Sequence, residues 1–119
     1  MAHYKSTKSS KATELEIIYT DCTTESIAQL IEDMFAKERY SIKTGDLGNR
    51  SYFKGNFAAK FFLGPFSEYL EFLVYTIDLG NGDVKMTMRK SSSGIVDGIN
   101  GRRQTKKELE RLKTTLIAL

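Results

Sequence analysis

The sequence predicts a two-layer α+β fold in which two helices cover one face of an antiparallel sheet of about five to six strands. Two long runs of β-type composition flank Asn81-Gly82, the strongest short-range signal for a tight hairpin. Amphipathic helical patterns lie near both ends of the chain. Short β-type runs between them are joined by tight turns, which require neighbouring strands to be antiparallel. Because two helices have one sheet to cover, we expect both on the same face.

Length and composition fit one domain. The chain has 119 residues and a formal net charge of +3, so an anionic partner is permitted but not required. Its single cysteine, Cys22, cannot form an internal disulfide, which favours a reducing compartment. No signal peptide or membrane span is visible in the sequence. We therefore expect a cytoplasmic protein without a membrane span.

Residues 1–13 differ in composition from the rest of the chain. They are rich in Lys, Ser and Thr and show no periodicity. We therefore predict a flexible basic arm at residues 1–13, followed by a single α+β domain at residues 14–119. Two uses of the arm are open: a solubilising tail, or a segment whose lysines follow phosphate groups.

The domain is predicted to begin with a strand and a helix. Glu14 to Thr20 alternates apolar and polar residues, which is typical of a half-buried strand. Thr23 or Thr24 can cap a following helix that runs through Lys37. Its apolar stripe repeats at helical spacing and comprises Ile27, Leu30, Ile31, Met34 and Phe35.

A series of strands follows this helix. We predict strands at Tyr40–Lys43, at Arg50–Lys54 and at Phe57–Leu63, with a short helical turn as the alternative for the third. The last two strands form the Asn81-Gly82 hairpin. Pairing Gly80 with Asp83 sets the register of this hairpin and predicts that Leu79, Ile77 and Tyr75 face the core opposite Val84, Met86 and Met88.

This register leaves an apolar set on the other face of the same strand. Leu70, Phe72 and Val74 are then expected on the open side of the sheet, where contiguous apolar surface indicates an interface. A partner protein or a second copy of the chain can cover them. The alternative is that the loop at residues 91–101 folds across them.

That loop and the helix after it form the second candidate site. Backbone N–H groups at a helix N-terminus can bind an anion, and nearby glycines allow its close approach. The predicted anion- or ligand-binding residues are Ser92, Ser93, Gly94, Gly98, Gly101, Arg102 and Arg103. A simple strand-to-helix connection is the alternative. The helix has either a capping box at Thr105 and Glu108 or Asn100 as its cap, and Leu109, Leu112 and Leu116 form its buried stripe.

The predicted order is β-α-β-β-β-β-β-α. This order resembles a single repeat of the TATA-binding-protein-like fold, and the resemblance lies in topology alone. It implies a similar arrangement of elements and says nothing about function.

The residues favour binding over catalysis. The single histidine, His3, lies in the predicted arm, so no histidine-based acid–base pair is available in the domain. We expect no enzymatic activity, no metal and no cofactor. Our first hypothesis is a small binding or protein-interaction module that can self-associate through the open sheet face. The alternative is a nucleic-acid or other polyanion binder that uses the basic arm, the loop at residues 91–101 and four cations at the start of the last helix, Arg102, Arg103, Lys106 and Lys107. A third class, a pocket for an apolar ligand, is suggested by the many aromatic residues.

Overall fold

One antiparallel sheet with two helices on one face forms the fold, as predicted. The computed structural model describes residues 3–10, 13–55, 69–91 and 99–119. The strands in this part of the chain are β1 (His3–Ser10), β2 (Glu14–Thr20), β3 (Ser41–Asp46), β4 (Asn49–Gly55), β5 (Tyr69–Gly80) and β6 (Asp83–Lys90). The helices described are α1 (Thr24–Lys37) and α3 (Ile99–Ile117).

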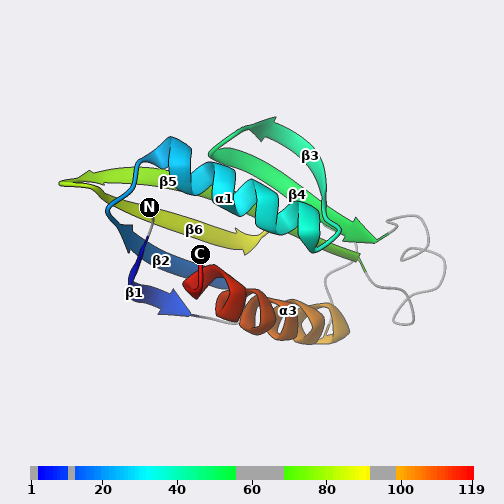
Figure 1. Ribbon diagram of the computed structural model, residues 1–119. Helices are drawn as coiled ribbons and strands as arrows, with labels where there is room; N and C mark the ends of the chain where they lie inside the picture. The colour runs from blue at the N-terminus through cyan, green and yellow to red at the C-terminus, as the bar shows by residue number, and fades with distance from the viewer. Residues whose placement is uncertain (1–2, 11–12, 56–68, 92–98) are drawn as a thin grey trace.

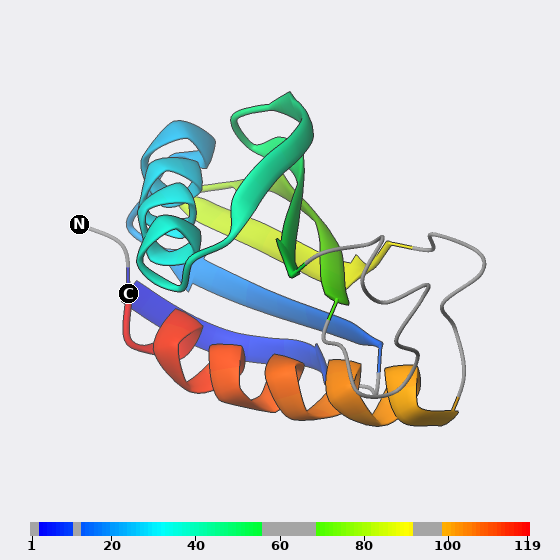
Figure 2. The same ribbon diagram turned by 90° about the vertical axis from the view of Figure 1, so that its right-hand side faces the viewer.

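The six described strands lie in the order β1-β2-β6-β5-β4-β3, and every neighbouring pair is antiparallel. Helix α1 packs over β5, whereas α3 lies along β2 (Figures 1 and 2). The order from β2 to α3 is strand, helix, four strands, helix. The predicted strand at Phe57–Leu63 lies outside the described residues.

Strand β1 occupies residues that we expected to be a flexible arm. His3–Ser10 pairs with β2, with two irregularities in the register, so that prediction is wrong for these residues. None of the side chains from Tyr4 to Lys8 is buried, which explains why the segment has no apolar period. Backbone pairing holds this edge strand, together with an ion pair of 2.6 Å between Lys5 Nζ and Asp83 Oδ2.

Helix α1 follows its sequence signals closely. Thr23 is the N-cap, and its side chain accepts a hydrogen bond from the Ser26 backbone N–H at 3.0 Å. The Ser26 hydroxyl in turn accepts from the Thr23 N–H, which completes a capping box. The predicted stripe is buried except for Leu30, which is 37% exposed.

Helix α3 starts earlier than the capping signals predicted. Thr105 lies inside the helix and is buried, so the predicted capping box at Thr105 is wrong. The stripe of Leu109, Leu112 and Leu116 is buried as predicted. The far end of α3 is fixed to the sheet, because Tyr19 Oη donates a hydrogen bond of 2.7 Å to the carbonyl oxygen of Leu116.

The β5–β6 hairpin has the predicted turn but a different register beyond it. Asn81 and Gly82 have φ of 56° and 82°, and Gly80 pairs with Asp83. A bulge at Leu79 then places Asp78, not Leu79, opposite Val84. All predicted pairs after the turn are therefore wrong by one residue. Since side chains alternate with a period of two, a shift of one residue exchanges the two faces of β5.

Candidate functional site

The bulge moves the predicted interface residues into the core. Leu70, Phe72 and Val74 are 8%, 0% and 4% exposed and belong to the cluster that the helices cover. The prediction that they lie on the open side of the sheet is therefore wrong. Their place is taken by the alternate residues of β5, Leu73, Tyr75 and Ile77.

We call the sheet surface opposite the helices the outer face. In the register of β2, β6 and β5, Ile18, Lys85 and Ile77 lie side by side on this face. Tyr75 lies beside Thr87 in the next row, and Leu73 beside Arg89 in the row after it. An apolar strip on β5 thus runs along the outer face, next to polar side chains of β6.

The charged groups of the outer face largely neutralise one another. Lys85 Nζ lies 3.3 Å from a carboxylate oxygen of Glu16, and Lys43 Nζ lies 2.8 Å from one of Glu71. The Arg89 guanidinium lies 5.9 Å from the centre of the Tyr75 ring, in a cation–π arrangement. Among the described residues, the outer face is therefore an apolar strip next to paired charges.

The end of this strip projects beyond strand β4. Pairing of β5 with β4 ends at Tyr75, followed by a hydrogen bond of 2.9 Å from the Thr76 N–H to the Gly48 carbonyl. β5 continues past this point to Gly80 as the pointed end at the left of Figure 1. In this segment Ile77 is 44% exposed and Leu79 is 47% exposed. We call Ile77–Gly80 the projecting end of β5.

The predicted anion site is only partly within the described structure. Ser92, Ser93, Gly94 and Gly98 lie outside the described residues. Gly101, Arg102 and Arg103 belong to the first turns of α3, whose side chains there are also outside the described part. Gly101 is therefore a helical residue and not a loop glycine as predicted. The anion-binding role of the set stays a prediction.

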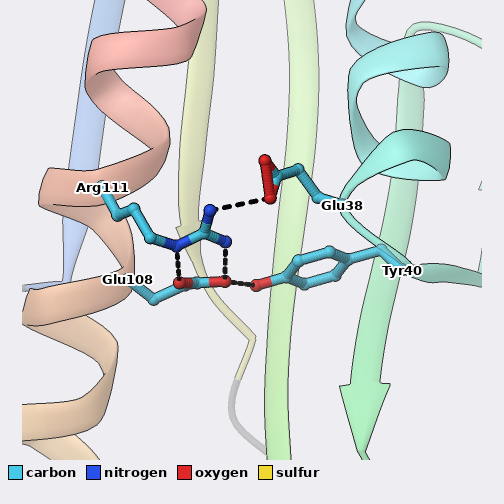
Figure 3. A network of polar contacts seen from close by, with 4 residues as sticks. All are labelled: Glu38, Tyr40, Glu108 and Arg111. Atoms are coloured by element: carbon cyan, nitrogen blue, oxygen red, sulfur yellow. Dashed lines mark hydrogen bonds and ion pairs between the residues drawn. The ribbon is translucent and has the colours of Figure 1, made fainter.

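Sequence reasoning missed a polar network that joins α3 to the end of α1 and the start of β3 (Figure 3). Arg111 donates two hydrogen bonds to the Glu108 carboxylate, at 2.7 and 2.9 Å, and a third to Glu38 at 2.7 Å. Tyr40 Oη donates to Glu108 at 2.6 Å. The three-residue spacing of Glu108 and Arg111 was the one local signal, because the other two partners come from distant parts of the chain.

The network fixes the protonation states of Glu108 and Tyr40. Burial by itself would raise the pKa of Glu108, but hydrogen bonds from Arg111 and Tyr40 outweigh it and hold this pKa below its usual value. The pKa of Tyr40 is raised by burial and then by its bond to the Glu108 carboxylate. Glu108 is thus ionised and Tyr40 protonated at neutral pH. The arrangement suits a structural connection better than proton transfer.

A second network of the same chemistry joins α1 to β4. Glu32 accepts a hydrogen bond of 2.6 Å from Arg50 Nη1 and another from Tyr52 Oη. The ring of Phe35 stacks on Tyr52 with 4.3 Å between centres and meets Tyr40 edge-on at 4.9 Å. Each described helix is therefore held by a carboxylate that binds one arginine and one tyrosine.

Other classes of site find little support in the described residues. No group of three or more His, Cys, Asp or Glu that could hold a metal occurs in this part of the chain. The pKa of Cys22 is raised by burial and by nearby Asp83, which disfavours the reactive thiolate. Neither described helix is long and apolar enough to cross a membrane.

Comparisons with protein families, with curated proteins and with solved structures find no match to this chain. The resemblance to a TATA-binding-protein-like repeat therefore remains one of element order.

Proposed function

We propose that the protein is a non-enzymatic interaction module that binds a partner protein, or a second copy of itself, through the outer face and the projecting end of β5. The observation that carries this proposal is the exposure of Ile77 and Leu79, each more than two fifths open to solvent on a strand that extends past its neighbour. Apolar side chains grouped at such a position are typical of contact surfaces.

The surroundings of these residues favour a protein partner. Protein interfaces combine an apolar centre with a polar rim and are enriched in tyrosine and arginine. The outer face has this composition, with Leu73, Tyr75 and Ile77 in the strip and Arg89 beside it. Because Lys85 and Lys43 are already paired with carboxylates, this face is poorly suited to a polyanion.

The absence of catalysis is also part of the proposal. Two buried carboxylates in the described part, Glu71 and Glu108, are each ion-paired to a lysine or an arginine. Hydrogen bonds from Arg111 and Tyr40 lower the pKa of Glu108, which makes this carboxylate a weak general base.

A pair of matched substitutions tests the proposal. Ile77→Lys places a charge in the strip, whereas Ile42→Lys makes the same change at a residue of β3 that is 51% exposed. A photoreactive amino acid at position 77, and separately at position 42, identifies what each site touches in cells. We expect cross-links mainly at position 77, and loss of the corresponding complex in Ile77→Lys but not in Ile42→Lys. Equal cross-linking at both positions would refute the proposal. Complexes that form equally well in the parent and in Ile77→Lys would also refute it.

A second candidate function rests on the first half of α3. Lys106 and Lys107 are exposed, and no ion pair from either is found within the described part of the chain. They extend the predicted cationic group at Arg102 and Arg103. Two results would favour this function. Binding of single-stranded DNA should weaken steeply as the salt concentration rises. At any one salt concentration, a Lys106→Glu, Lys107→Glu double variant should bind this DNA more weakly than the parent. Binding that is unaffected by salt would exclude this function.

A further inference from the structure

We propose that Asn81-Gly82 is a site of spontaneous deamidation in the folded protein, where the Asn81 side chain is converted to isoaspartate and aspartate. The two residues form the exposed turn between β5 and β6. This modification is independent of the proposed function. It depends on the chemistry of one side-chain amide and the backbone nitrogen that follows it.

Both reacting groups are free of partners within the described structure. Neither the Asn81 carboxamide nor the Gly82 N–H makes a hydrogen bond with a described residue, although the Gly82 carbonyl accepts one of 3.1 Å from the Cys22 N–H. Gly82 has no Cβ that would hinder the approach of Cγ to its nitrogen, although the Asp21 backbone nitrogen lies 3.7 Å from where a Cβ would stand. A Cβ built at Gly80 meets nothing within 4 Å, which shows open space on the β5 side of the turn.

The reaction needs only water and a base from the solvent. The Gly82 nitrogen loses its proton to the base, and its electron pair forms a bond to Cγ of Asn81. The amide nitrogen of Asn81 takes up a proton and leaves Cγ as ammonia, and a five-membered succinimide ring remains. One water then opens the ring. Cleavage between the nitrogen and Cγ gives aspartate, whereas cleavage between the nitrogen and the backbone carbonyl carbon gives isoaspartate.

The position of the turn makes this reaction accessible in the native state. The nitrogen can approach Cγ when the turn opens transiently, which requires release of the Gly80–Asp83 pair and of the Cys22–Gly82 hydrogen bond. Local opening of an exposed segment costs less free energy than opening of the core of a fold. The chain contains the same dipeptide at Asn100-Gly101, where the backbone is helical. Helical geometry restricts the approach of the Gly101 nitrogen to Cγ of Asn100. Asn100 is therefore an internal control for Asn81 in the same molecule.

Deamidation would alter the projecting end of β5. Isoaspartate adds a backbone carbon to a two-residue turn, and the geometry of that turn sets the register of β5 against β6. Both products also add a negative charge close to Asp78 and Asp83. If the proposed interface is correct, ageing of this turn would weaken it, and this consequence alone rests on the proposed function.

Peptide mapping by mass spectrometry tests the proposal on the purified, folded protein. Samples are incubated at neutral and mildly alkaline pH, and isoaspartate is labelled with an isoaspartyl methyltransferase. We expect acid at Asn81 to accumulate several-fold faster than at Asn100, to accumulate faster at higher pH, and to include isoaspartate. Asn81→Gly is the control, because glycine accepts the positive φ of the turn but has no amide to lose.

A second sample separates protection by the fold from lack of reactivity. Protein denatured in urea exposes both Asn-Gly sequences equally, so both should react at similar rates. If Asn81 keeps its amide in the folded protein while it reacts in the denatured one, the turn protects it and the proposal is wrong. Equal rates at Asn81 and Asn100 in the folded protein would also overturn it.

Discussion

The Glu108 carboxylate accepts three hydrogen bonds at a position that is 8% exposed, and this makes it sensitive to acid. Its pKa is lower in the folded protein than in an unfolded chain, where a glutamate has a pKa of about 4.3. The folded state therefore binds fewer protons in this range. Its contribution to stability is complete above the unfolded value and is lost as the pH falls through the folded value.

We predict that Glu108→Gln lowers the free energy of unfolding at neutral pH by about 1.5–3 kcal/mol, the range for hydrogen bonds to charged groups. The variant should also lose less stability than the parent between neutral and acidic pH. Chemical denaturation over that range measures both effects. Glu110→Gln is the control, since Glu110 is an exposed neighbour on the same helix. A parallel loss of stability with pH in parent and Glu108→Gln would contradict the assignment.

At the scale of the elements, the β5–β6 hairpin shows how far pattern reasoning reaches. The turn and the Gly80–Asp83 pair follow from Asn-Gly chemistry, and both are confirmed. The bulge at Leu79 could not be predicted from alternation, because both faces of β5 carry large apolar residues. The sequence held one local signal for a bulge, the glycine directly before the turn. In the structure this residue, Gly80, has a φ of 88°.

Strand β1 could not be predicted from hydrophobic alternation, because a polar edge strand has no apolar period in its sequence. We predict that deletion of residues 1–10 lowers the free energy of unfolding, since it removes the ladder with β2 and exposes the edge of that strand. Urea denaturation measures the loss. Lys5→Ala removes only the exposed ion pair with Asp83 and should have a smaller effect. An unchanged transition after the deletion would restore the interpretation as an unstructured arm.

At the scale of the whole molecule, both described helices cover one side of the sheet, and no described helix lies on the other side. The apolar stripes of α1 and α3 predicted this arrangement, because each stripe is as wide as one sheet contact. The networks that orient the helices were not predictable. Glu38 and Arg111 lie 73 positions apart, and nothing local indicates that they meet. The sequence pointed to β5 as the strand with apolar residues on both faces, but it did not show which of those faces the helices cover.

We predict that two aromatic residues three positions apart on β5 respond very differently to removal. Phe72 is fully buried beside Tyr40 with 6.1 Å between ring centres, whereas Tyr75 is half-buried on the outer face. Phe72→Ala should cost about 3–5 kcal/mol of stability, the usual range for a buried phenylalanine.

Tyr75→Ala should cost about 1 kcal/mol or less, the scale of an exposed cation–π contact such as the one with Arg89. Thermal or urea denaturation at two protein concentrations measures both variants. The Phe72→Ala loss should be the same at both concentrations, because it arises inside one molecule. If Tyr75→Ala cost more than Phe72→Ala, the helices would have to cover the face of Tyr75. The strand would then have the register predicted from the sequence, without a bulge at Leu79.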